Sequence, residues 1–221
     1  MIENFLAQLR ADGVAADAPL VIFDVGSRDC AQSIEFYEAF PNARIVAFEC
    51  NPQTLPLCAA VAAARADRLT LVPKAVHVYD GTCTFFPIDP ARTVTSWADG
   101  NPGASSLFRA NGEYDVEHYV QTETTVECTT LASAAAALGI ARVDLIWMDL
   151  QGAELLALQG MGDLLNGVRY VHTELSFRAM YTGQALFADV HSYLHTQGFG
   201  LTTGVSGRGW QTDGIYRNTR I

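Results

Sequence analysis

Short apolar runs alternate with helix-like segments along most of this 221-residue chain. The first run, Leu20–Val25, is apolar except at Asp24, which is typical of a strand buried on both faces. Helical spacing follows over Ala31–Phe40, and the next strand-like run is Arg44–Glu49. This alternation predicts a mainly parallel sheet with helices on both of its faces.

The rest of the chain continues the pattern. Further helices are expected over Leu55–Ala66, Thr130–Leu138, Ala153–Leu165 and Leu186–Gln197, and further strands over Leu69–Val72, Val143–Met148, Val168–Leu175, Gly200–Val205 and Gln211–Tyr216. The last two strands are separated by only Ser206 to Gly209, which is too short for a parallel crossover and predicts an antiparallel pair. No repeat or long linker interrupts the sequence, so residues 1–221 are expected to form one domain.

Three segments stand outside this alternation. Residues 1–19 are expected to contain a short amphipathic helix at Ile2–Leu9. Val76–Tyr79 and Thr82–Ile88 flank Asp80-Gly81, a dipeptide suited to a tight turn, and this predicts a β-hairpin. Residues 93–117 are rich in Gly, Ser and Asn and are expected to form a loop over a binding site.

The charge balance limits the classes of partner. Apolar residues make up 49% of the chain and charged residues 17%, which predicts a folded protein. The 24 acidic and 14 basic residues give a net charge of -10. Nucleic acids are therefore not expected as partners, because their binding depends on clustered Lys and Arg.

The location is predicted from two further features. No apolar run reaches the roughly 18–20 residues that a membrane-spanning helix needs, and the first residues lack a basic leader. The five cysteines are odd in number and include no C-x-x-C pair, which argues against a disulfide framework and a thiolate zinc site. We therefore expect a cytoplasmic enzyme with reduced thiols.

Candidate binding residues follow the first strand. Ligands of open α/β sheets bind at the carboxyl ends of the strands. The first strand ends in Asp24-Val25-Gly26-Ser27-Arg28, where Gly26 allows close approach of the backbone to a ligand. The dinucleotide fingerprint G-x-G-x-x-G is absent, because Arg28 and Ala31 stand where its second and third glycines belong. The turn is either a cofactor loop of another kind or an ordinary strand-to-helix connection.

An acid ends the second strand. Glu49 stands 25 positions after Asp24. Its carboxylate can accept hydrogen bonds from two ribose hydroxyls. Alternatively, Glu49 caps the following turn at Asn51-Pro52.

Acids and a histidine follow two later strands. Asp149 ends one of them, with Glu154 one helical turn later, and the next strand carries His172 and Glu174 on the same side. These groups can hold a cation, act as a base or attract a positively charged cofactor. Glu154 can instead complement a helix dipole, and His172 can be a packed core residue.

The chain resembles the FkbM family of S-adenosylmethionine-dependent methyltransferases from about Leu20 to the C-terminus. The resemblance rests on DVGSRD (24–29), AFECNP (47–52), KAV (74–76), GASSL (103–107), TTL (129–131), DLQGAELLALQG (149–160) and TELSF (173–177). The family often reads DVGANxG at the first turn, where this chain has Ser27, Arg28 and Cys30. Gln151 replaces the common Glu of the aspartate-x-glutamate-glycine-alanine-glutamate box.

The resemblance implies a Rossmann-like class I methyltransferase fold, a three-layer α/β sandwich. Its seven-stranded sheet is mostly parallel and ends in an antiparallel hairpin. The implied cofactor is S-adenosylmethionine, and the implied acceptor is a hydroxyl of a sugar, glycan or natural product. No residue is assigned to a metal ion, and no oligomeric state is predicted.

The site residues that follow combine the resemblance with the predicted strand order. Cofactor contacts are expected from Asp24, Gly26, Ser27, Arg28, Glu49, Cys50, Ala75, Val76, Ser106 and Asp149. The methionine end is expected over Asp24, Gly26 and Ser27, and adenine near Ala75 and Val76. Asp149 is the first choice for the base, Glu174 the second, and His172 the reserve.

Two other functions fit part of this pattern. A NAD(P)-dependent Rossmann oxidoreductase would share the Gly26 turn and Glu49. A non-catalytic cofactor-binding module would explain the departures at Arg28, Cys30 and Gln151.

Overall fold

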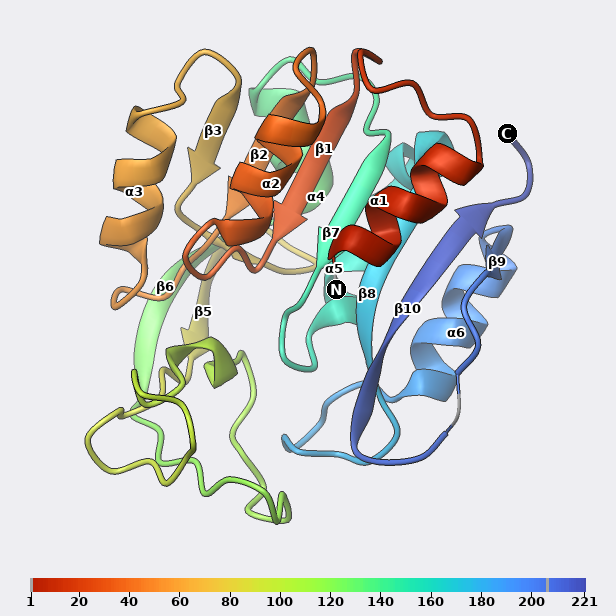
Figure 1. The fold of residues 1–221 in the computed structure, drawn as a ribbon. Coiled ribbons are helices and arrows are strands. Elements are labelled where there is room, and N and C mark those ends of the chain that lie inside the picture. The colour runs from red at the N-terminus through yellow and green to blue at the C-terminus, as the bar shows by residue number, and fades with distance from the viewer. Residues whose placement is uncertain (1, 206) are drawn as a thin grey trace.

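The main sheet has seven strands in the order β3-β2-β1-β7-β8-β10-β9 in the computed structural model, which describes residues 2–205 and 207–221 (Figure 1). The bounds are β1 Val21–Val25, β2 Arg44–Phe48, β3 Leu69–Val72, β7 Leu145–Met148, β8 Tyr170–Ser176, β9 Phe199–Leu201 and β10 Gln211–Asn218. The first five strands in this order pair in parallel, and β10 is antiparallel to both of its neighbours. The predicted fold and its antiparallel end are confirmed. Ser206, the first residue of the predicted connection, lies outside the described residues.

Helices cover both faces of this sheet (Figure 1). The bounds are α1 Ile2–Ala11, α2 Ala31–Ala39, α3 Leu55–Ala63, α4 Leu131–Ala137, α5 Glu154–Gln159 and α6 Phe187–Thr196. One core joins the sheet to α1, α2 and α3, and a second core joins the other face to α4, α5 and α6. Among the helices of residues 2–205 and 207–221, none is both long and apolar enough to cross a membrane.

Neighbouring residues on a strand enter opposite cores, which explains the continuous apolar runs in the sequence. On β1, Ile22 belongs to the core beneath α1, α2 and α3, whereas Phe23 belongs to the core beneath α4, α5 and α6. Ile45 and Val46 divide in the same way on β2. A strand covered on both faces has no side on which polar residues are favoured.

The helix predicted over Ala153–Leu165 is shorter in the structure. α5 ends at Gln159, and the 3-10 helix η2, Gly162–Gly167, follows it. A Cβ at Gly160 would lie 2.5 Å from the carbonyl oxygen of His77, so a glycine is required where the helix ends.

The predicted hairpin around Asp80-Gly81 is wrong. A small second sheet has the order β4-β6-β5, with β4 Ala75–Val76, β5 Gly81–Phe85 and β6 Thr124–Thr129. The later strand β6 lies between the two expected partners, parallel to β4 and antiparallel to β5. The reason lies partly in Asp80, whose carboxylate accepts hydrogen bonds from Thr129, Thr130 and Ser133 at the start of α4. Asp80 therefore joins this corner to α4.

Residues 86–123 make a long excursion between β5 and β6, and they contain the short 3-10 helix η1, Pro102–Ala104. This excursion lies at the end of the molecule toward which β1, β2 and β3 point (Figure 1). Isolated bridges Phe86–Ser106 and Val94–His118 hold it together. The predicted loop 93–117 lies within it, next to the carboxyl ends of the parallel strands.

Candidate functional site

Two adjoining cavities lie at the carboxyl ends of the parallel strands. The first contains about 560 Å³ and the second about 1320 Å³ of space between atoms, part of which is open to solvent. Both are lined by Gly26, Arg28, Gly103, Asp149 and Gln151. These five residues come from the turn after β1, the loop 86–123 and the end of β7, so three distant parts of the sequence form the boundary between the cavities.

The turn after β1 packs directly on the end of β7. Gly26 has a φ of 86°, and a Cβ at this position would lie 2.0 Å from the backbone oxygen of Asp149. A glycine is therefore required both by the backbone conformation and by the contact with β7. The close approach that the sequence suggested is made first of all to the protein itself.

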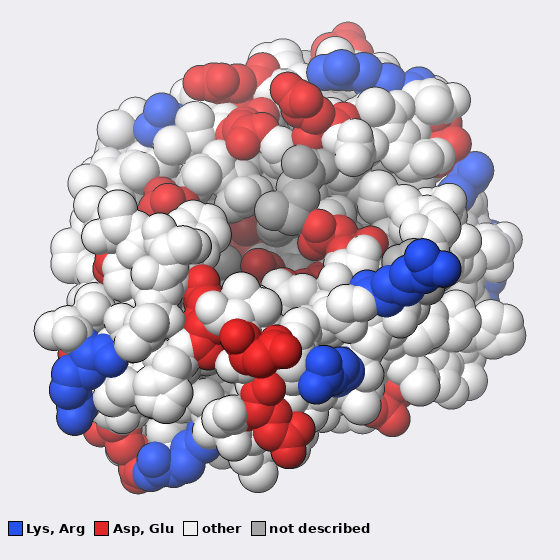
Figure 2. All heavy atoms as spheres, turned by 60° about the horizontal axis from the view of Figure 1, so that its bottom comes forward, with Lys and Arg blue, Asp and Glu red and all other residues white. Residues whose placement is uncertain are grey.

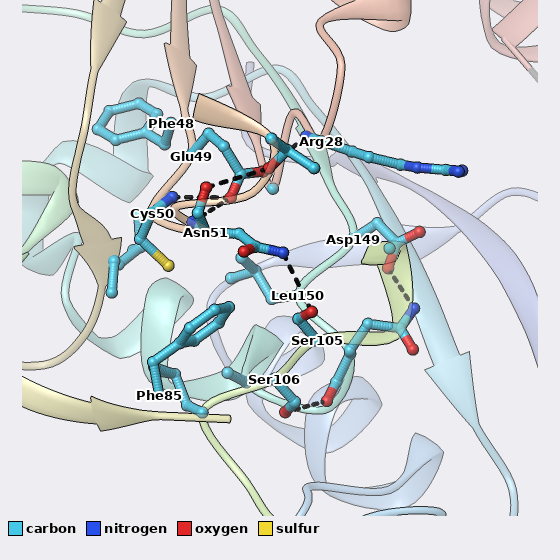
Figure 3. A pocket seen from close by; sticks show the side chains of 18 of the residues that line it. Arg28, Phe48, Glu49, Cys50, Asn51, Phe85, Ser105, Ser106, Asp149 and Leu150 are labelled. Atoms are coloured by element: carbon cyan, nitrogen blue, oxygen red, sulfur yellow. Dashed lines mark hydrogen bonds between the residues drawn. The ribbon is translucent and has the colours of Figure 1, made fainter. Parts of the chain in front are cut away.

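Glu49 lies beside this turn and lines the first cavity. Its carboxylate accepts hydrogen bonds from the backbone N–H groups of Arg28, Cys50 and Asn51, at 2.7, 2.8 and 2.6 Å (Figure 3). Burial raises the pKa of this carboxyl to about 7, although the three backbone hydrogen bonds act in the opposite direction. The capping role considered from the sequence is thus present, and it holds the carboxylate at the cavity wall.

The remaining wall of the first cavity combines an apolar surface with serine hydroxyls. Its apolar members include Phe48, Ala75, Val76, Phe85, Leu107 and Leu150, and Cys50 lies among them (Figure 3). Ser105 accepts a hydrogen bond of 3.1 Å from the Asn51 amide. Ser106 donates one of 2.8 Å to the backbone oxygen of Gln151. The loop containing both serines is thereby fixed to the ends of β2 and β7.

Two predicted cofactor residues, Asp24 and Ser27, are buried and line neither cavity. Asp24 is 1% exposed and accepts a very short hydrogen bond from Ser33 of α2. Its Oδ1 has no hydrogen-bond partner among the described residues, and burial raises its pKa to about 6. Ser27 donates to the backbone oxygen of Asp24 at 2.9 Å. These contacts hold the turn in its conformation and attach it to α2.

Three carboxylates meet where the cavities join. Asp149, Glu154 and Glu174 each place one oxygen within 4.8 Å of the others. Glu154 is buried, and its Oε1 accepts hydrogen bonds from the backbone N–H groups of Leu150 at 2.8 Å and Gly152 at 3.3 Å. Glu154 therefore supports the loop after β7, whereas Asp149 and Glu174 line the second cavity.

Gln151 connects Asp149 and Glu174. Its Nε2 donates to Asp149 Oδ1 at 2.8 Å and to Glu174 Oε2 at 3.3 Å, and its Oε1 lies 2.9 Å from the hydroxyl of Tyr181, which donates to it. The sequence indicated Gln151 only as a departure from the family box and gave no sign of the contact with Tyr181. Although Asp149 is exposed within the cavities, the surrounding protein limits its hydration and raises its carboxyl pKa; burial also raises that of Glu174.

His172 has the surroundings of a packed aromatic ring. It is 3% exposed and stacks on Trp147, with ring centroids 3.5 Å apart and an angle of 3° between the planes. Burial lowers its pKa to about 3, so the ring is neutral at physiological pH and a weak proton acceptor. It lines the second cavity, and its Nε2 lies 3.8 Å from Asp213 Oδ1.

The loop 86–123 supplies the other side of the second cavity. Its lining side chains there include Trp97, Asn101, Tyr114, Glu117 and Tyr119. Arg28 reaches this loop through an ion pair of 2.6 Å with Asp99, and its guanidinium carbon lies 5.0 Å from the ring centre of Trp97. The loop is thus attached to the turn after β1.

A protein-family model described as the methyltransferase FkbM domain matches residues 24–201. The chain belongs to the FkbM methyltransferase family. It is 27% identical over 203 residues to the 2-O-methyltransferase NoeI of Sinorhizobium fredii (strain NBRC 101917 / NGR234). The matched region covers 91% of this chain and 80% of NoeI. This FkbM methyltransferase is therefore an S-adenosylmethionine-dependent enzyme, and the oxidoreductase and non-catalytic alternatives lose their support.

Solved structures agree with this fold. The FkbM methyltransferase matches the fibrillarin pre-rRNA processing protein of Methanococcus jannaschii with a TM-score of 0.51 and 11% identity, covering 92% of this chain and 69% of that one. It matches a putative O-methyltransferase from Klebsiella pneumoniae with a TM-score of 0.50 and 12% identity, covering 97% and 78%. At these identities the likeness concerns the fold alone.

Proposed function

We propose that the enzyme methylates a hydroxyl group of a sugar, glycan or natural product, with the cofactor in the first cavity and the acceptor in the second. The observation that carries this proposal is the position of Asp149, which lines both cavities where they join. A methyl group donated from one cavity and an oxygen presented in the other would meet beside this carboxylate.

The first cavity has the chemistry that S-adenosylmethionine requires. The apolar wall around Ala75, Val76 and Phe85 suits an adenine ring, and Glu49 lines the same cavity, where it can accept a hydrogen bond from the ribose. A carboxylate has about four acceptor sites, so the three backbone hydrogen bonds of Glu49 leave about one site for a ribose hydroxyl. When bound, S-adenosylmethionine supplies a methyl group on a positively charged sulfur.

The methionine end is then assigned to the boundary formed by Gly26, Arg28 and Asp149. Ser106 and Cys50 complete the assigned contacts on the other side of this cavity. Asp24 and Ser27 are assigned a supporting role, because both are buried and line neither cavity.

The base is assigned to Asp149, with Glu174 as the second choice. A hydroxyl acceptor has a high pKa and requires a proton acceptor within hydrogen-bond distance. The raised pKa of each carboxyl makes it a stronger base than an ordinary Asp or Glu. The Gln151 amide holds both carboxylates in place. His172 is a less suitable base, because burial lowers its pKa to about 3.

The acceptor is assigned to the sugar class on two grounds. NoeI is a 2-O-methyltransferase, which supports an oxygen as the methylated atom, and the present chain matches 80% of its length. The second cavity presents aromatic rings from Trp97, Tyr114 and Tyr119 together with carboxylate and amide groups, and such a mixture suits a ligand with apolar ring faces and many hydroxyls.

The remaining assignments concern the whole chain. Residues 1–221 are proposed to act as one domain, because β1 near the start and β10 near the end belong to one sheet. The cysteines are all free thiols, which supports a cytoplasmic location.

The test follows an isotopically labelled methyl group. The protein is incubated with S-adenosylmethionine carrying a deuterated methyl group and with fractionated carbohydrate extracts, and labelled products are located by mass spectrometry. Label on a sugar oxygen is expected, and the Asp149→Asn protein serves as the control that retains the fold. Failure to bind S-adenosylhomocysteine, or label found only on nitrogen or carbon, would contradict the proposal.

A further inference from the structure

The carboxylates of the second cavity indicate the charge of the acceptor. We propose that the acceptor is a saccharide bearing a positively charged amino group, which Asp149, Glu174 and Asp213 bind beside the hydroxyl that is methylated. This inference rests on the proposed function of the two cavities and goes further by naming the chemical class of the acceptor.

The lining of the second cavity is strongly acidic. Its carboxylates are those of Asp29, Glu117, Asp149, Glu174 and Asp213. Arg28 is the one Lys or Arg side chain among the described residues of this lining, and it is already paired with Asp99 at 2.6 Å. Figure 2 shows Asp and Glu gathered around a hollow in this end of the molecule, with Lys and Arg farther from its centre.

Three of these acids form a row across neighbouring strands. Asp213 on β10 is directly opposite Glu174 on β8 in an antiparallel pair, and side chains in such positions lie on the same face. Asp149 follows Met148, which pairs with Thr173 of β8, and its carboxylate lies in the same cluster as Glu174. Like charges placed directly opposite each other destabilise a sheet, so this row costs stability unless a proton or another positive charge binds there.

Neutral amides reach part of this row: the side chains of Gln211 and Gln151 donate to the two oxygens of Glu174, at 2.6 and 3.3 Å. Among the described residues, Asp213 accepts no hydrogen bond, and the neighbouring His172 is neutral because burial lowers its pKa to about 3. The pKa of Asp213 is raised to about 6, by burial and by the charge of Asp149. Among residues 2–205 and 207–221, no Lys or Arg side chain forms an ion pair with any of these three acids, and the bound cofactor carries a single net positive charge.

An ammonium group fits this arrangement better than a divalent metal ion. The Gln151 amide directs N–H groups toward Asp149 and Glu174, and an N–H group cannot ligate a metal. The third member of the compact cluster, Glu154, has its Oε1 engaged by two backbone N–H groups. An ammonium group can instead donate three hydrogen bonds to carboxylates spread over a wider surface. The same field repels phosphorylated, sulfated and uronic acid acceptors.

The experiment compares three trisaccharides as binding probes: one of glucosamine, its fully N-acetylated form and one of galacturonic acid. Binding to the protein saturated with S-adenosylhomocysteine is measured by titration calorimetry near neutral pH. We expect the glucosamine trisaccharide to bind about tenfold more tightly than the neutral probe, since hydrogen bonds to charged groups contribute that much to affinity. The acidic trisaccharide is expected not to bind.

Two variants locate the effect. Asp213→Asn keeps the size of the side chain and is expected to remove most of the preference for the amino sugar. Asp163→Asn removes an equal charge from an exposed position outside both cavities and is expected to retain the preference.

The result would overturn the inference if the glucosamine trisaccharide did not bind, or if the neutral or acidic probe bound equally well. A second outcome would also overturn the inference. In it, Mg²⁺ binds to the wild type and displaces the amino sugar, and the Asp149→Asn variant no longer binds Mg²⁺. The binding of S-adenosylhomocysteine is measured first, and it distinguishes failure of the proposed function from failure of this inference. Its absence would contradict the proposed function, whereas its presence without a charge preference would contradict this inference alone.

Discussion

The Glu49 carboxylate accepts a hydrogen bond of 2.7 Å from the backbone N–H of Arg28. This contact joins the end of β2 to the turn after β1, two segments that both line the first cavity. The carboxylate is therefore held in position before any cofactor binds, and a preorganised group loses less entropy on binding than a mobile one.

Replacement of Glu49 by alanine is expected to weaken the binding of S-adenosylhomocysteine at least about tenfold, because hydrogen bonds to a charged group are lost. Three backbone N–H groups also lose their acceptor, so the melting temperature falls as well. Calorimetry on the folded variant measures the affinity. Glu35→Ala, at an exposed position of α2, is the matched control. Unchanged affinity in Glu49→Ala would contradict the ribose assignment.

Gly26→Ala is expected to destabilise the protein by more than the roughly 1–3 kcal/mol typical of a strained backbone position, because the added Cβ also meets the Asp149 backbone oxygen. Gly139→Ala provides the control. Gly139 has a φ of 66°, and a Cβ added there would have no atom within 4 Å, so that variant introduces backbone strain without a collision. Denaturant unfolding compares the two. Equal losses of unfolding free energy in the two variants would show that the collision with β7 does not destabilise the protein.

Asp149→Asn and Glu174→Gln are expected to retain the fold and cofactor binding. The variant that lacks the base should lose turnover by about 10²–10⁴-fold, the range typical of general base catalysis. Release of S-adenosylhomocysteine at saturating acceptor measures this loss. Chelators should leave the wild-type rate unchanged. Full activity in both variants would show that alignment of the two substrates is sufficient for transfer.

The unfolding free energy is expected to fall as the pH rises from about 5 to 7 and to level above that range. Burial raises the pKa of Glu154 to about 7, as it does for Glu49, so the folded protein holds protons that the unfolded chain releases. Glu154 accounts for at most about 3 kcal/mol of this change. Urea unfolding at several pH values tests it. The Glu154→Gln protein should show a shallower slope, and an identical slope would contradict the assignment to Glu154.

Arg28→Ala is expected to increase hydrogen exchange in the loop 86–123 near Trp97 and Asp99. The ion pair and the contact with the indole ring together contribute about 1 kcal/mol at this partly exposed position. Mass spectrometry of exchanged peptides reports the change. Arg92→Ala removes another ion pair of the same loop, with Asp89, and should leave the exchange near Trp97 as it is.

The sequence predicted the main sheet because its strands are covered on both faces. Such strands form uninterrupted apolar runs, as in Val143–Met148, and they are easily recognised. The strand β6, Thr124–Thr129, was not predicted. Its first four residues alternate between half-buried and exposed and are mostly polar, so the segment resembles a loop. Its position between β4 and β5 also depends on Asp80 and its partners near α4, which are distant in the sequence.

The candidate site was predictable to the same extent. Strand ends identify the place of Glu49, Asp149 and Glu174, because the carboxyl ends of parallel strands meet at one edge of the sheet. The sequence does not show which side chains hydrogen-bond to one another. The burial of Asp24 beneath α2 depends on Ser33, and the role of Gln151 depends on Tyr181, thirty residues away.

The small sheet determines how the loop 86–123 enters and leaves the molecule. Phe85 is paired with Thr124, so the chain departs from one strand and returns beside the same point on its neighbour. The entropic cost of closing such a loop rises only slowly with its length. This segment supplies three aromatic residues of the second cavity, Trp97, Tyr114 and Tyr119. The acids Asp149, Glu174 and Asp213 instead belong to the main sheet or directly adjoin it. The segment also supplies Gly103, Ser105, Ser106 and Leu107 of the first cavity. Exchanging it between related enzymes would therefore transfer the recognition of the acceptor's shape together with one wall of the methyl-donor pocket, while the three acids of the main sheet stay those of the recipient.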